Sequence, residues 1–131
     1  MTRAYSTKKI GDKGEAYTVS YLKKKGYKIL AQNYRKNYGE IDIIAKNGDM
    51  LCFVEVKTRH SNTITQPYEA VDRRKQTKII KTAEAYLIEN KLELNCRFDV
   101  SEVFVDKESL KLEKINYIAA AFDAQNSGFC F

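Results

Sequence analysis

The sequence is poor in the residues that hold small extracellular and zinc-binding domains together. Its three cysteines are Cys52, Cys96 and Cys130. An odd cysteine count without a C-x-x-C pair argues against both a disulfide framework and a zinc site. Cys52 lies within an apolar segment, so we expect it to be a small buried side chain.

Long apolar segments are also missing. No run approaches the roughly 18 residues that a membrane-spanning helix needs, and residues 1–14 contain no apolar signal core. There are no internal repeats, low-complexity tracts or linkers. We therefore expect one domain over residues 1–131 in a reducing cytoplasm, with no membrane partner and with loose tails over 1–6 and 124–131.

Positive charge is in excess over negative charge. The formal net charge is +6 and the sequence pI is about 9.2. Nucleic acid is the first candidate partner because its backbone presents repeated negative charge. Many small basic proteins bind no polyanion, however, so charge alone leaves both interpretations open.

Apolar periodicity and turn residues predict one α/β domain with the order α-β-β-β-α-β-β and a mixed sheet. Asn47-Gly48-Asp49 separates two strands rich in apolar residues and is typical of a hairpin turn. Thr7 is a candidate helix cap, and the lysines and glutamates of the last strand indicate a sheet edge. The expected elements are a helix over 8–25, strands over 27–35, 41–44 and 51–57, a helix over 68–90, strands over 96–106 and 110–118, and a short helical turn over 119–122.

Ionisable residues interrupt the otherwise apolar hairpin. Glu55 and Lys57 are two positions apart on one strand and so share a face, which Asp42 can reach from the neighbouring strand. Carboxylates in such a place need a partner. A hard divalent cation that prefers oxygen ligands, Mg²⁺ or Mn²⁺, is the best candidate. It could bind a phosphate oxygen and acidify a water, with Lys57 orienting that water or stabilising charge on the phosphate.

Two helical residues could join this group. Glu15 falls on the face of the first helix that should pack inward, so it could bind the cation directly or through a water. It could instead complement the helix dipole. Gln76 lies on the apolar face of the second helix, where it could fix a phosphate or hold Lys57, although a glutamine at a helix border needs no special role.

Asp42, Glu55 and Lys57 together form D-x12-E-x-K, which resembles the PD-(D/E)xK nuclease motif. The segments GEAYTVSYLKKKGYKIL, NYRKNYGEIDIIA, FVEVKTR and RFDV resemble the YraN family of small bacterial proteins. That resemblance covers about residues 10 to 105. It implies a restriction-endonuclease-like fold, similar to Holliday junction resolvases, which act as dimers. It also implies that Asp42, Glu55 and Lys57 form the catalytic triad, that Glu15 matches the resolvases' helical glutamate, and that Ile41 replaces the motif's proline.

The sequence therefore predicts a Mg²⁺- or Mn²⁺-dependent nuclease that acts on DNA. The alternative is a module of the same fold that binds nucleic acid or protein without cutting it. The candidates for contacting DNA are Arg59, Arg73, Arg74, Lys75 and, by stacking, Tyr38. For the charge run 73–75 a solvated helix face is the alternative.

Three further residues are assigned lesser roles. His60, the only histidine, is expected to be a solvated residue in a polar loop rather than a phosphate contact. Glu40, on the strand of Asp42, is taken as structural or as a support of the site. Asp99 is expected to pair with Arg97 or Arg35.

Overall fold

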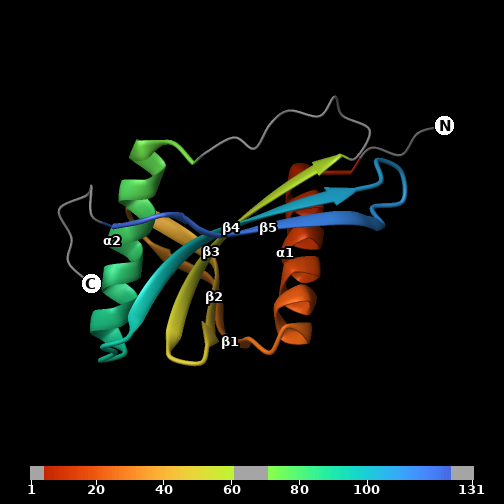
Figure 1. Cartoon of the computed structure of the whole chain (residues 1–131). Coiled ribbons are helices and arrows are strands. Elements are labelled where there is room, and N and C mark those ends of the chain that lie inside the picture. Colours follow the sequence, from red (N-terminus) through yellow and green to blue (C-terminus); the bar gives the residue numbers. More distant parts are fainter. Residues whose placement is uncertain (1–4, 61–70, 125–131) are drawn as a thin grey trace.

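The computed structural model describes residues 5–60 and 71–124, which form a five-stranded mixed sheet with a helix on either side (Figure 1). The order α-β-β-β-α-β-β is confirmed. The elements are α1 (Thr7–Lys24), β1 (Lys28–Lys36), β2 (Gly39–Asn47), β3 (Met50–His60), α2 (Arg73–Glu89), β4 (Asn95–Val105) and β5 (Leu112–Phe122).

The strands lie in sequence order, β1-β2-β3-β4-β5, so β3 is central and β5 is an edge strand, as expected. The β2–β3 hairpin turns at Gly48, whose positive φ of 60° suits glycine. Among the strands of the described residues, only β3 and β4 pair in parallel, and α2 lies in the crossover between them. No helix among the described residues is long and apolar enough to cross a membrane.

Side-chain caps set where the helices begin. Ser6, rather than Thr7, caps α1 by accepting a hydrogen bond from the Lys9 N–H. Asp72 caps α2 by accepting one from the Lys75 N–H, so α2 begins at Arg73 and not at 68. Residues 68–70 lie outside the described part of the chain.

The prediction of a helical turn over 119–122 was wrong, because β5 continues through Phe122. Phe98 of β4 pairs with Phe122, and Val100 pairs with Ile118. The irregularity between these pairs contains Ala120, whose φ is 52° and whose N–H donates to the buried Asp99 carboxylate. Strand pairing thus outweighs the helix preference of an alanine run.

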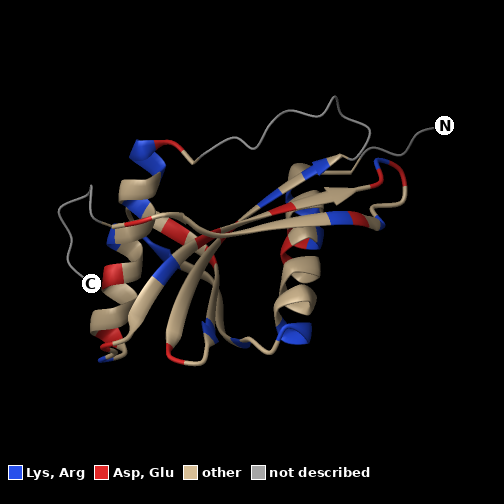
Figure 2. Cartoon of the chain, viewed as in Figure 1, with Lys and Arg blue, Asp and Glu red and all other residues tan. Residues whose placement is uncertain are grey.

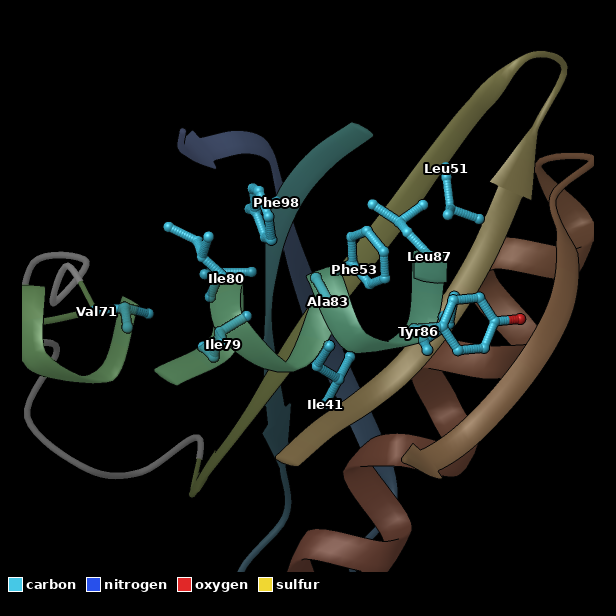
Figure 3. Close-up of a cluster of buried hydrophobic side chains, with 12 residues drawn as sticks. Ile41, Leu51, Phe53, Val71, Ile79, Ile80, Ala83, Tyr86, Leu87 and Phe98 are labelled. Carbon is cyan, nitrogen blue, oxygen red and sulfur yellow. The ribbon is translucent and has the colours of Figure 1, made fainter. Parts of the chain in front are cut away.

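The two faces of the sheet form separate cores. Toward α2, Phe53 and Phe98 stack and pack with the helix residues Ile80, Ala83 and Leu87 (Figure 3). Toward α1, the core contains Leu22, Ile43, Ala45, Cys52 and Val54. Cys52 is fully buried, as expected. The alternation of faces along β2 and β3 produces this division.

Asp99 is a fully buried structural carboxylate on the sheet. The Arg97 guanidinium donates to both of its oxygens, at 2.8 and 2.9 Å, and the Tyr117 hydroxyl donates at 2.5 Å. The expected pairing with Arg97 is confirmed. These contacts satisfy the carboxylate within the fold.

Each helix approaches the sheet closely at a glycine–threonine contact. Gly14 of α1 is buried against Thr58 of β3, where an added Cβ would overlap the threonine hydroxyl. On the other face, a Cβ at Gly39 of β2 would lie 2.5 Å from the Thr82 hydroxyl of α2. Neither position has room for a larger side chain without a shift of the helix.

Gly14→Ala should therefore destabilise the fold by about 1–3 kcal/mol because the methyl group overpacks the contact with Thr58. Gly11→Ala, one turn earlier in α1, is the matched control, since nothing lies within 4 Å of its added Cβ. That change should stabilise α1 by about 0.5–1 kcal/mol. Urea unfolding of both variants measures the difference. Equal effects of the two substitutions would contradict the close approach of α1 to β3.

Candidate functional site

The candidate site lies where β2 and β3 separate. Their residue pairing runs from Asn47↔Met50 to Ile43↔Val54 and goes no further. Just beyond it, the Asp42 side chain, through Oδ2, accepts the Val56 N–H at 2.8 Å. A carboxylate thus bridges the two strands where the backbone ladder ends, and this anchors Asp42 to β3.

Asp42 and Glu55 lie between two adjoining hollows that both of them line. One hollow opens toward α2 and is completed by Gly39, Glu40, Lys75, Lys78 and Ile79. The other opens toward α1, has a volume of about 380 Å³, and is completed by Thr7, Ile10, Gly11, Glu15, Val56, Thr58 and His60. The two hollows together, here called the cleft, give access to both carboxylates.

Burial and like charge set the protonation of Asp42. Burial, followed by the negative charge of Glu55, raises its pKa to about 8, although the hydrogen bond from Val56 acts in the opposite direction. Glu55 is itself buried, with 8% of its surface exposed. Two acids that are largely buried and that raise each other's cost of ionisation favour any cation that can reach both of them.

Glu15 lies at the α1 margin of the same cleft. Burial raises its pKa, and the charges of Asp12 and Glu40 add to the effect. With its side-chain amide turned to donate, Asn33 of β1 bridges Glu15 at 3.0 Å and Glu40 at 3.3 Å. Asn33 was missed from the sequence. Its one distinguishing property is a φ of 53°, which asparagine tolerates well but the sequence does not reveal.

The lysine in contact with the carboxylates comes from α2. Lys75 Nζ lies 2.5 Å from Glu55 Oε1, and about half of the Lys75 side chain is exposed. Burial alone would lower the pKa of Lys75, but the hydrogen bond and charge of Glu55 outweigh it and raise that pKa. Lys57 shares the strand face of Glu55, yet within 5–60 and 71–124 its ammonium has no ion pair or hydrogen bond and lines neither hollow.

The donor set matches a hard cation with few protein ligands. No group of three or more Asp, Glu, His or Cys side chains in the described residues is arranged to hold a metal, so Glu15 does not converge on one point with Asp42 and Glu55. The pair that does share the cleft supplies only carboxylate oxygens. Mg²⁺ keeps several waters and needs one or two protein carboxylates, so these two fit it.

The remaining candidates lie around the cleft or away from it. Gln76 donates to the carbonyl of Val71, which lies just before α2, at 2.6 Å, and it lines neither hollow. Arg59 forms an ion pair at 3.4 Å with buried Glu102. The Lys81 ammonium lies over the Tyr38 ring at 4.4 Å. Arg73 and Arg74 are exposed at the start of α2, where Figure 2 shows positive charge gathered.

His60 was expected in a polar loop, and this was wrong. It ends β3, whose parallel pairing with β4 extends to His60↔Val105. The side chain is half-buried and lines the α1-side hollow. Its Nδ1 is buried and has no hydrogen-bond partner among the described residues. Pairing with β4, which the local sequence does not reveal, extends β3 to His60 and so places the histidine in the same hollow as the carboxylates.

Comparison with known proteins places the chain among uncharacterised relatives. Residues 14–103 match the model of uncharacterised protein family UPF0102. A UPF0102 protein of Caldanaerobacter subterraneus is 47% identical over 88% of this chain and 95% of its own length. A UPF0102 protein of Chlorobium chlorochromatii is 50% identical over 80% of this chain and 81% of its own length. A UPF0102 protein of Dictyoglomus thermophilum is 43% identical over 89% of this chain and 99% of its own length. The YraN-type resemblance is confirmed at this level.

The raised pKa of Asp42 predicts a pH-dependent effect of Asp42→Asn. Native Asp42 keeps its proton up to pH about 8, whereas the unfolded chain releases it near 3.8, so this group destabilises the fold increasingly as pH rises between those values. At pH 9 the variant should be more stable than the wild type by on the order of 1–3 kcal/mol, and at pH 4.5 nearly equal to it.

Thermal unfolding across this pH range measures the effect. Asp49→Asn, in the exposed hairpin turn, is the matched control and should differ from the wild type by a constant amount. A pH-independent difference for Asp42→Asn would show that Asp42 does not share a dry, negatively charged site.

Proposed function

We propose that this chain, which belongs to uncharacterised protein family UPF0102, is a divalent-cation-dependent nuclease that acts on DNA. The observation that carries the proposal is the placement of Asp42 and Glu55. The two carboxylates are mostly buried, line one cleft, and stand where two strands part beside a basic helix. A fold gains no stability from two buried acids that oppose each other's ionisation, so a function for them is the better explanation.

The proposal includes a restriction-endonuclease-like fold. Its support is the order of the elements together with the position of the acids. A helix precedes a hairpin whose two strands carry D and E-x-K, and α2 then crosses over to a parallel strand. The two acids of the PD-(D/E)xK motif, Asp42 and Glu55, line the same two hollows, which supports the proposal.

Asp42 and Glu55 would hold the cation, and Glu15 at the cleft margin would support it through a water. When bound, Mg²⁺ or Mn²⁺ supplies charge neutralisation at a phosphodiester oxygen and makes a water easier to deprotonate. Lys57 extends from β3 on the face of Glu55 without a partner in the described residues, so it is available to orient the attacking water. The Asp42–Val56 hydrogen bond keeps one ligand in place before substrate arrives.

DNA would approach along the start of α2. Arg73, Arg74 and Lys78 are exposed there, and Lys78 also lines the cleft. Backbone phosphates held by these side chains would lie beside the carboxylates. Arg59 and Tyr38 are secondary candidates because Glu102 and Lys81 already engage them. Gln76 would act only by keeping the start of α2 in position. A cytoplasmic location and a resolvase-like homodimer belong to the same proposal.

A non-catalytic DNA-binding module is the second candidate. The ion pair between Lys75 and Glu55 favours it, because that contact neutralises one carboxylate without any metal. The two candidates differ in their need for a cation. A binding module would hold DNA in a salt-sensitive manner and show no Mg²⁺ or Mn²⁺ binding by calorimetry.

Purified protein should cleave at least one of branched, nicked or single-stranded DNA in Mg²⁺ or Mn²⁺. Glu55→Gln and Asp42→Asn should each lower the cleavage rate by about 100-fold or more, because each removes a cation ligand, and Lys57→Gln should lower it by about 10- to 100-fold.

Glu113→Gln, on exposed edge strand β5, is the control and should cleave as the wild type does. Chelation should abolish cleavage by every variant. If the wild type and Glu55→Gln cleave equally, the activity comes from a contaminant and the nuclease proposal is wrong.

A further inference from the structure

We propose that Lys75 is the internal counter-cation of this site, and that its ammonium competes with the divalent cation for Glu55. The inference rests on the proposed function, since it concerns the cation that Asp42 and Glu55 would hold. It assigns Lys75 a task distinct from that of Lys57. Lys75 is a positioning residue that acts through Glu55, and it sets how readily the site accepts a metal.

The fold places Lys75 at Glu55 by means of its backbone. The Asp72 cap accepts the Lys75 N–H at 2.9 Å, which fixes this residue in the first turn of α2. Farther along, Thr82 packs against Gly39, so the helix lies close to β2. The side chain then spans the short distance to Glu55 Oε1, at 2.5 Å.

The ion pair joins a buried acid to a lysine whose side chain is half exposed and can move into solvent. Only 10% of the Glu55 side chain is exposed, compared with 49% of the Lys75 side chain. An unpaired carboxylate at this depth would be unfavourable, so the ammonium stabilises the cation-free site. Because Lys75 is half exposed, its flexible side chain can swing into solvent without a movement of α2.

The two cations compete for Glu55. An ammonium and a divalent ion on the same carboxylate would repel each other across a few ångströms in a partly buried cleft. Cation binding therefore weakens the Lys75–Glu55 ion pair or displaces Lys75 into solvent, and the lost interaction subtracts from the cation's affinity. Lys57 has no such contact in the described residues and imposes no comparable barrier.

Mn²⁺ titration calorimetry on the free protein tests this competition without any activity assay. Lys75→Gln should bind Mn²⁺ about tenfold more tightly than the wild type, because the competing charge is removed. Lys75→Arg keeps a competing cation and should bind within about threefold of the wild type. Lys78→Gln is the matched control, since Lys78 lines the same hollow without pairing with Glu55, and it should tighten binding by no more than about twofold.

Three results would contradict the inference. If Lys75→Gln is folded by circular dichroism and binds Mn²⁺ no more tightly than the wild type, Lys75 does not compete, and the proposed function stands. If Lys78→Gln tightens binding as much as Lys75→Gln, general electrostatics and not the ion pair is responsible. If neither the wild type nor Lys75→Gln binds Mn²⁺ at millimolar concentration, the metal-dependent function and the competition are both wrong.

Discussion

The hydrogen bond from the Val56 N–H to the Asp42 carboxylate is the contact on which the rest of the site depends. It forms where the ladder between β2 and β3 ends, and it holds an acidic side chain at a place where burial opposes its ionisation. With Asp42 fixed there, burial and then the charge of neighbouring Glu55 raise its pKa, and the two acids line the same cleft. The fold therefore keeps together two acids whose ionisation is unfavourable, and a bound cation would offset that cost.

The two helices flank the pair of acids from opposite faces of the sheet. Gly14 lets α1 approach Thr58, and the next residue, Glu15, reaches the cleft margin. Gly39 lets α2 approach β2 on the other face, which brings Lys75 within reach of Glu55. An additional acid, Glu15, thus lies on the α1 side of the pair, and a lysine ammonium, that of Lys75, lies on the α2 side. The close helix–sheet contacts that stabilise the fold also determine which side chains surround the carboxylates.

Local rules were sufficient to predict the element order and the central pair. The Asn47–Asp49 turn predicted the β2–β3 hairpin, and alternation along its strands placed Asp42 and Glu55 together. The same rules could not show that Lys75 contacts Glu55, because that depends on how α2 packs against Gly39. The extension of β3 to His60 depends on parallel pairing with a strand 45 positions later in the chain (His60↔Val105) and is likewise invisible locally.

The central claim is that Asp42 and Glu55 together form a divalent-cation site. The most direct test is an anomalous difference map from a crystal soaked in Mn²⁺. The account predicts a peak within about 2.0–2.3 Å of an oxygen of each carboxylate, with the Lys75 ammonium withdrawn from Glu55. A map with no peak at this cleft, and with Lys75 still paired to Glu55 at saturating Mn²⁺, would contradict it.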